Sequence, residues 1–124
     1  VLAVDDSAMD RNIMKKSMEP IGVKVIEASN GQEALNMLKS SEYTIDAVLI
    51  DIEMPRMDGF EVTNLVRHHE IHRELPIIMI TSRTGEKHRE RAFSLGVNNY
   101  MGKPFQEANL LENITAALQA GREA

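Results

Sequence analysis

The chain has 124 residues, a formal net charge of −5 and no cysteine, which suits one globular domain and excludes disulfides and thiolate metal sites. The mildly acidic charge argues against direct binding of nucleic acid or of an anionic membrane, and no apolar run is long enough to span a bilayer. The lack of cysteine fits a reducing compartment, so we expect a cytoplasmic location. Residues 1–124 open on a strand-like run without an initiator Met, from which we expect a single domain excised from a longer protein.

Short apolar runs alternate with helical patterns along the first part of the chain. Residues 1–4 predict a buried strand, and Ser7 with Asp10 matches a helix N-cap followed by a capping-box acid. The helix predicted after them has an apolar stripe at Met9, Ile13, Met14 and Met18. Residues 23–28 alternate as in a half-buried strand, and Asn30 is placed to cap a second helix.

The rest of the chain continues this alternation three more times. An apolar run at 45–50 predicts the central strand, and Asp58 is placed to cap the helix that follows it. Pro76 sits where a strand tolerates it, at the start of the apolar run after it. A polar helix is expected at 86–95 and a short strand at 99–101. The final amphipathic helix is marked by Leu110, Leu111, Ile114, Ala117 and Leu118.

Five strand-helix units in succession indicate an α/β fold with a parallel sheet covered by helices on both faces. We therefore predict a flavodoxin-like (βα)5 doubly wound sheet with right-handed crossovers. The expected strand order is 2-1-3-4-5, taken from known folds of this kind rather than derived from the residues.

Reactive side chains follow four of the five predicted strands at their carboxyl ends: Asp5-Asp6, Asp51, Thr81-Ser82 and Lys103. Open parallel sheets bind ligands beyond these ends, at the point where the strand order reverses. In the expected order that point lies between the strands that end at Asp6 and Asp51. We therefore expect one cleft to gather all of these groups.

Three carboxylates in one cleft repel strongly, by roughly 4 kcal/mol for two charges about 4 Å apart at an effective dielectric near 20. An all-oxygen site without histidine or cysteine suits a hard divalent cation, and Mg²⁺ is usual where a phosphoryl group also binds. Lys103 adds a compact cation and Thr81 a hydroxyl, both suited to phosphoryl oxygens. Because aspartate can form an acyl phosphate, and phosphoryl transfer needs alignment more than a base, we predict transfer onto Asp51.

A second hypothesis from the same residues is a Mg²⁺-dependent phosphohydrolase with an aspartyl phosphate intermediate. Glu53 stands two residues after Asp51, where such enzymes commonly place a second acid. Against it, the sequence shows no cap domain and no substrate pocket. We expect self-catalysed phosphorylation and dephosphorylation rather than a conventional enzyme.

Four short motifs, in this order and at these intervals, match those of a known family. They are Asp5-Asp6, Asp51 with Met-Pro-x-Met-Asp-Gly at 54–59, Thr81-Ser82, and Lys103-Pro104. With them the chain resembles the receiver domain of two-component response regulators over essentially its whole length. The resemblance implies that a phosphohistidine on a histidine kinase or phosphotransfer domain donates the phosphoryl group.

The resemblance also implies a role for each acidic and basic site residue. Asp51 would accept the phosphoryl group. Asp6 would bind Mg²⁺ directly, Asp5 largely through water, and Glu53 through its backbone carbonyl. Lys103 would pair with the carboxylate or the phosphate.

Further roles implied by the resemblance concern switching. Thr81 would move toward the phosphoryl group and Tyr100 would swing inward behind it. Ser82, being small, would leave the site open, and the Lys103-Pro104 bond would be cis. These movements would switch the face of the fourth helix, fifth strand and fifth helix, where an output partner would bind.

A narrower similarity, carried by the runs at 54–62, 78–92 and 102–107, is to receivers at the C-terminus of chemotaxis-type hybrid histidine kinases. This similarity leaves open whether the domain is a switch or a phosphate sink within such a kinase. For its oligomeric state, we expect a monomer or weak dimer.

We also hypothesise that Glu53 and Arg83 flank the phosphoryl group, pair across the cleft mouth and slow attack by water.

Overall fold

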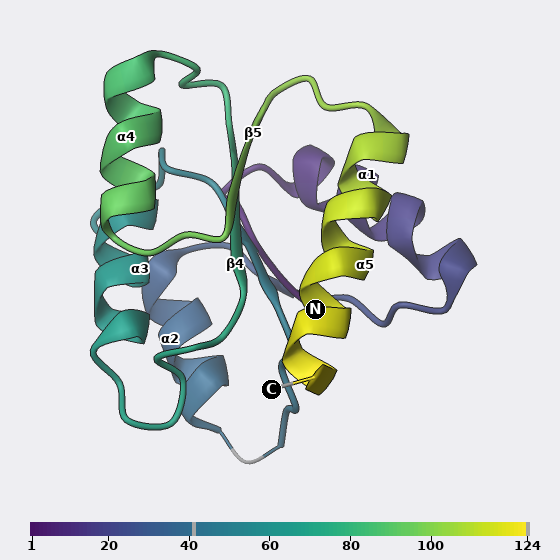
Figure 1. Cartoon of the computed structure of the whole chain (residues 1–124), viewed down its shortest axis with the longest axis horizontal. Helices are drawn as coiled ribbons and strands as arrows, with labels where there is room; N and C mark the ends of the chain where they lie inside the picture. Colours follow the sequence, from purple (N-terminus) through teal and green to yellow (C-terminus); the bar gives the residue numbers. More distant parts are fainter. Residues whose placement is uncertain (41, 124) are drawn as a thin grey trace.

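The computed structural model describes the backbone of residues 1–40 and 42–123, with side chains as far as residue 119 (Figure 1). The strands are β1 (Leu2–Val4), β2 (Ile26–Ala28), β3 (Val48–Ile50), β4 (Ile77–Thr81) and β5 (Asn99–Gly102). The α-helices are α1 (Ala8–Met18), α2 (Gly31–Lys39), α3 (Gly59–Arg67), α4 (Glu86–Ser94) and α5 (Glu107–Glu123). None of the helices in the described part of the chain has the length and apolar character needed to cross a membrane.

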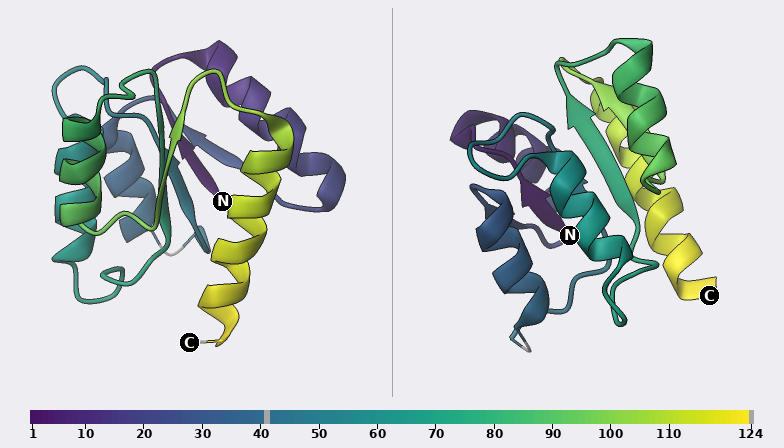
Figure 2. Two further views of the ribbon diagram at one scale, coloured as in Figure 1. Left: turned by 45° about the horizontal axis from the view of Figure 1, so that its top comes forward. Right: turned by 90° about the vertical axis from the view of Figure 1, so that its left-hand side faces the viewer.

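The five strands form one parallel sheet in the order β2-β1-β3-β4-β5. Helices α1 and α5 pack on one face of this sheet, and α2, α3 and α4 pack on the other (Figures 1 and 2). The predicted doubly wound α/β fold and its strand order are therefore confirmed.

Two apolar cores, one on each face, arise from the alternation of side chains along the strands. In β3, Val48 and Ile50 join the core under α2, α3 and α4, whereas Leu49 joins the core under α1 and α5. In β4, Ile77 and Met79 face the first core, and Ile78 and Ile80 face the second. Both faces of the sheet are buried, which explains why the strands appear in the sequence as continuous apolar runs.

The predicted N-caps of α2 and α3 are formed. The Asn30 side chain accepts from the Glu33 N–H at 2.8 Å, and the Asp58 side chain accepts from the Glu61 N–H at 2.9 Å. Each bond satisfies a backbone donor that the first turn of a helix leaves free. The cap at Asp58 fixes where α3 begins, directly after the loop that follows Asp51.

The predicted apolar stripe of α1 is only half buried. Met14 and Met18 are fully buried, but Met9 is 73% and Ile13 46% exposed. Met9 and Ile13 lie on one line along the helix and Met14 and Met18 on the next, about 100° further around. Only the second line faces the sheet.

Two strands are shorter than predicted from 23–28 and 45–50. Both pair with β1, whose Leu2 faces Ile26 on one side and Val48 on the other. The ladder therefore starts at Ile26 and Val48. Val23 and Val25 instead pack into the core under α1 and α5.

Candidate functional site

Strand register brings two of the predicted acids side by side. Val4 pairs with Ile50 across β1 and β3, so Asp5 and Asp51 leave the sheet at the same level. The Asp51 N–H still donates to the Val4 carbonyl at 3.1 Å, and this fixes the backbone of the central acid. Both carboxylates are buried, with Asp5 wholly shielded and Asp51 only 6% exposed.

Lys103 follows directly after β5, the edge strand of the sheet, and its side chain extends to these acids. Its backbone N–H donates to the Thr81 carbonyl at 2.9 Å, which continues the β4–β5 ladder by one residue. Its ammonium nitrogen lies 2.6 Å from Asp5 Oδ2 and 2.9 Å from Asp51 Oδ2. The Lys103-Pro104 peptide bond is cis.

The ammonium group has a third partner that the sequence analysis did not foresee. Asp10 Oδ2 lies 2.8 Å from Lys103 Nζ. We expected Asp10 to return a capping-box bond to the Ser7 N–H, but that N–H donates to Asp5 Oδ1 at 2.9 Å. The sequence signal for this contact is weak, because it consists only of an acid in the first turn of the helix after Asp5-Asp6.

Asp6 completes a group of three carboxylates. Asp5, Asp6 and Asp51 each offer a carboxylate oxygen, and these atoms lie within 4.8 Å of one another. Asp5 and Asp51 are buried whereas Asp6 is exposed, so the group opens to solvent on one side. Three oxygen donors at this spacing fit a hard divalent cation.

The charges of the site also favour a cation. Burial raises the pKa of the Asp5 carboxyl above its usual value, although the hydrogen bond from Lys103 opposes this effect. Burial by itself would lower the pKa of Lys103, but hydrogen bonds to three carboxylates outweigh it and raise that pKa. Lys103 therefore stays charged at neutral pH, and its single charge leaves the acidic cleft with an excess of negative charge.

Thr81 and Tyr100 form their side-chain hydrogen bonds with the backbone of Arg83. Thr81 is fully buried and its hydroxyl accepts from the Arg83 N–H at 3.1 Å. Tyr100 is 7% exposed and its hydroxyl donates to the Arg83 carbonyl. Within the described part of the chain, no hydrogen bond joins either side chain to Asp51. Tyr100 occupies an inward position in this structure, and Ser82 is exposed.

Glu53 and Arg83 form an ion pair at the mouth of the cleft. Arg83 Nε lies 2.6 Å from Glu53 Oε1, and both side chains are about half exposed. The hydrogen bond to Arg83 lowers the pKa of the Glu53 carboxyl. The pair joins the loop after β3, which begins at Asp51, to the loop after β4.

Gly59 and Arg11 contact the backbone of Asp51 and Asp5, and no individual role was predicted for either residue. Gly59 begins α3 so close to β3 that a Cβ atom there would lie 2.2 Å from the Asp51 carbonyl oxygen. The Arg11 guanidinium donates to the Asp5 carbonyl and to Glu27. The sequence shows Gly59 as the glycine of an Asp-Gly pair. The requirement for glycine, however, comes from the close approach of α3 to the backbone that follows β3.

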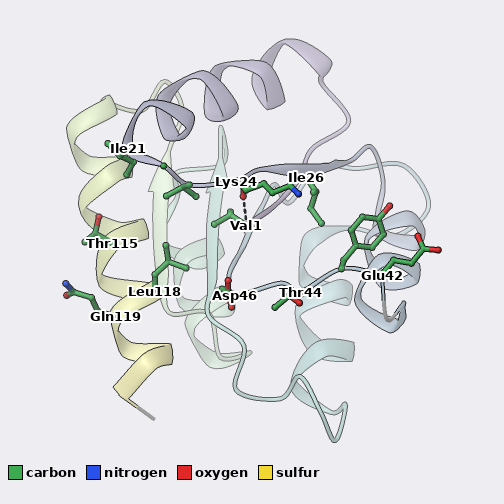
Figure 3. A pocket seen from close by; sticks show the side chains of 13 residues that line it. Val1, Ile21, Lys24, Ile26, Glu42, Thr44, Asp46, Thr115, Leu118 and Gln119 are labelled. Atoms are coloured by element: carbon green, nitrogen blue, oxygen red, sulfur yellow. Dashed lines mark hydrogen bonds between the residues drawn. The ribbon is translucent and has the colours of Figure 1, made fainter.

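A separate pocket lies at the other end of the sheet, at the amino ends of the strands (Figure 3). Its volume is about 680 Å³, and Val1, Lys24 and Asp46 are among the residues that line it. The amino group of Val1 donates to the Lys24 carbonyl at 2.9 Å. The acidic group and Lys103 do not line this pocket, so the chemistry of the chain lies at the opposite edge.

Comparison with known proteins identifies the family. A family model for the response regulator receiver domain matches residues 1–115. The chain belongs to this family. Receiver domains take part in two-component signalling, bind Mg²⁺ at an acidic pocket, and interact with histidine kinases or phosphotransfer partners.

Two curated relatives show the contexts in which similar receivers occur. The sensor histidine kinase CheAY of Helicobacter pylori is 44% identical over 105 residues, which cover 85% of this chain and 13% of that protein. The transcriptional regulatory protein SrrA of Staphylococcus aureus is 34% identical over 119 residues, covering 96% of this chain and 47% of that protein. The receiver thus spans less than half the length of either relative.

Solved structures agree with the fold of this receiver. The chemotaxis protein CheY4 of Vibrio cholerae has a TM-score of 0.84 at 31% identity, covering 94% of this chain and 96% of that one. A signal receiver domain of a histidine kinase from Syntrophus aciditrophicus has a TM-score of 0.86 at 25% identity, covering 96% of this chain and 89% of that one. The fold is therefore similar to that of a chemotaxis protein and to that of a histidine kinase receiver domain.

Proposed function

We propose that this receiver is phosphorylated on Asp51 by a phosphohistidine of a histidine kinase or phosphotransfer domain. The proposal is carried by the Lys103 ammonium, 2.9 Å from Asp51 Oδ2, beside a group of three carboxylates. An Asp51 carboxylate oxygen forms a bond to phosphorus as the phosphorus–nitrogen bond of the donor breaks. The donor imidazole nitrogen keeps the electron pair of that bond and takes a proton from water.

The acidic group would supply the metal site for this transfer. Asp5, Asp6 and Asp51, with the backbone carbonyl of Glu53, would hold Mg²⁺, which when bound offsets negative charge on the phosphoryl oxygens. Lys103 would donate to a phosphoryl oxygen as a compact cation. Alignment and charge neutralisation are what phosphoryl transfer needs most, and the cleft has residues for both.

A test of this proposal uses acetyl phosphate, a small phosphodonor, in place of the kinase. With Mg²⁺ present, the chain should gain the mass of one phosphoryl group, and removal of the metal with EDTA should abolish the gain because the acids then repel the donor. Intact-mass spectrometry measures the result. Labelling that is unaffected by EDTA would contradict the metal assignment, and steady turnover of p-nitrophenyl phosphate would favour the phosphohydrolase hypothesis instead.

We further propose that phosphorylation acts on the face formed by α4, β5 and α5, which are consecutive in the chain and adjacent in Figure 1. The Thr81 hydroxyl, which accepts from the Arg83 N–H here, would donate to a phosphoryl oxygen instead. A contact made only in the phosphorylated state shifts a two-state equilibrium. A shallow hollow lined by residues of β5 and the first half of α5 lies on this face, where an output partner would bind.

The similarity to a sensor histidine kinase supports a proposal about the whole protein. We infer that residues 1–124 form one receiver domain within a longer, kinase-type cytoplasmic protein. The 44% identity to CheAY, of which the chain covers 13%, is what supports this. In that setting the receiver would be a switch or a phosphate sink, and we expect a monomer or weak dimer.

We expect the Glu53–Arg83 pair to lengthen the lifetime of the phosphoryl group on Asp51. Replacing both residues with alanine should shorten the half-life of phosphorylated Asp51 several-fold, because the pair spans the cleft mouth and hinders water. Loss of label after removal of free donor measures the half-life. The matched control is alanine at Lys15 and Glu19, a pair 3.7 Å apart on α1, which should leave the half-life unchanged. An unchanged half-life in the Glu53/Arg83 variant removes this idea.

A further inference from the structure

Asp10 is placed differently from an ordinary first-turn acid. Its backbone N–H donates to the Ser7 hydroxyl at 3.2 Å, so the N-cap of α1 is formed without the Asp10 side chain. The return bond of a capping box is not made, because the Ser7 N–H donates to Asp5 instead. The Asp10 carboxylate, with its side chain 33% exposed, accepts from the Lys103 ammonium.

The Lys103 ammonium has three N–H donors, and three carboxylates occupy them. The Asp5 contact is short, at 2.6 Å, and its side chain is 1% exposed. The Asp51 contact belongs to the residue that would carry the phosphoryl group. A phosphoryl oxygen gains a bond from Lys103 only by displacing one of these acceptors. Asp10, the most exposed of the three, is therefore the acceptor that competes most directly with an incoming phosphoryl oxygen.

We propose that Asp10 is a positioning residue that acts through Lys103, an inference that rests on the proposed phosphorylation of Asp51. Asp10 shares the ammonium group with Asp5 and Asp51, so the ammonium is not free for a phosphoryl oxygen until that group arrives. Its negative charge lies within reach of the same ammonium as Asp5 and Asp51, so it attracts a divalent cation and repels a phosphoryl group. The side chain thus has opposite effects on the two ligands, favouring Mg²⁺ and opposing phosphorylation.

Substitution of Asp10 with Asn separates this role from a purely structural one. D10N keeps the size of the side chain and removes its charge. Its Mg²⁺ affinity, measured by calorimetry without donor, should fall by about three- to tenfold, the effect of losing one partly exposed charged contact. Its labelling rate by acetyl phosphate at saturating Mg²⁺ should rise by about the same factor.

Two further variants serve as controls. D10E keeps the charge and should remain closer to the parent than D10N in both measurements. E19Q makes the same charge change at the far end of α1, next to Lys15, and should match the parent in both. A weakened helix would lower thermal stability, but it would not move metal affinity and labelling rate in opposite directions.

The measurements distinguish failure of this inference from failure of the proposed function. If the parent chain is not labelled, phosphorylation of Asp51 is wrong and the role of Asp10 is lost with it. If the parent is labelled but D10N matches it in labelling rate or in Mg²⁺ affinity, the role of Asp10 alone is wrong. A slower rate for D10N at saturating Mg²⁺ would also overturn the inference, because it would make Asp10 a helper of the transfer.

Discussion

Replacement of Asp51 with Asn is expected to reduce labelling by acetyl phosphate and Mg²⁺ below detection. The amide oxygen keeps the shape of the side chain and can still accept from Lys103, which lies 2.9 Å from the carboxylate. It lacks the negative charge that makes a carboxylate oxygen nucleophilic. The chemistry should therefore be lost while the fold is kept. Intact-mass spectrometry detects the label, and circular dichroism checks the fold.

A matched control is available in the same loop. Asp58 caps α3 through the Glu61 N–H at 2.9 Å, and Asn is an equally good N-cap. Asp58→Asn should therefore be labelled at the parent's rate and have similar stability. If D51N still gained a phosphoryl group, the acceptor would have to be another residue.

The second large effect is expected at Gly59, where α3 approaches the backbone of Asp51. A Cβ atom at this position would lie 2.2 Å from the Asp51 carbonyl oxygen and 3.1 Å from Ile52 Cα. Both are backbone atoms, so no side-chain rotation relieves the clash and α3 must move away from β3. The Gly59 N–H also donates to the Ile52 carbonyl at 2.9 Å, a bond that this movement would strain.

We expect Gly59→Ala to lower the free energy of unfolding by about 1–3 kcal/mol, as other overpacked sites do. It should also slow labelling, by up to about 100-fold, because small displacements of a reacting group are costly. Urea unfolding and labelling rates measure the two effects.

Gly85→Ala is the control for this substitution, since the nearest atom to its Cβ is His88 Cδ2 at the ordinary contact distance of 3.6 Å. Gly85 is the N-cap of α4, so the control should lose only about 1 kcal/mol or less. If Gly59→Ala unfolded with the same free energy as the parent, the close approach of α3 to Asp51 would not limit this position.

Local patterns in the sequence predicted much of the fold. The caps at Asn30 and Asp58 were predicted because a cap depends on residues three positions apart. The alternation of apolar runs with helical patterns predicted five parallel strands, because side-chain periodicity differs between the two kinds of element. The ends of β2 and β3 were predicted less well, since they depend on which residues of β1 are available for pairing.

The sequence also did not predict which residues of α1 are exposed to solvent. Met9 and Ile13 have helical spacing, and the sequence cannot show which line of a helix faces the sheet. Of the four residues of the predicted stripe, the structure buries only Met14 and Met18, because α1 packs on the sheet beside α5 through that side.

The order of the elements, and the reactive groups that follow four of the five strands, can be read from the amino-acid sequence alone. Asp5, Asp51, Thr81 and Lys103 stand at strand ends, and the parallel order of the strands then requires those ends to share one edge. That Asp10 shares the Lys103 ammonium and that Gly59 must lack a side chain became apparent from the packed fold. Both depend on distances between packed elements, which no pattern of neighbouring residues encodes.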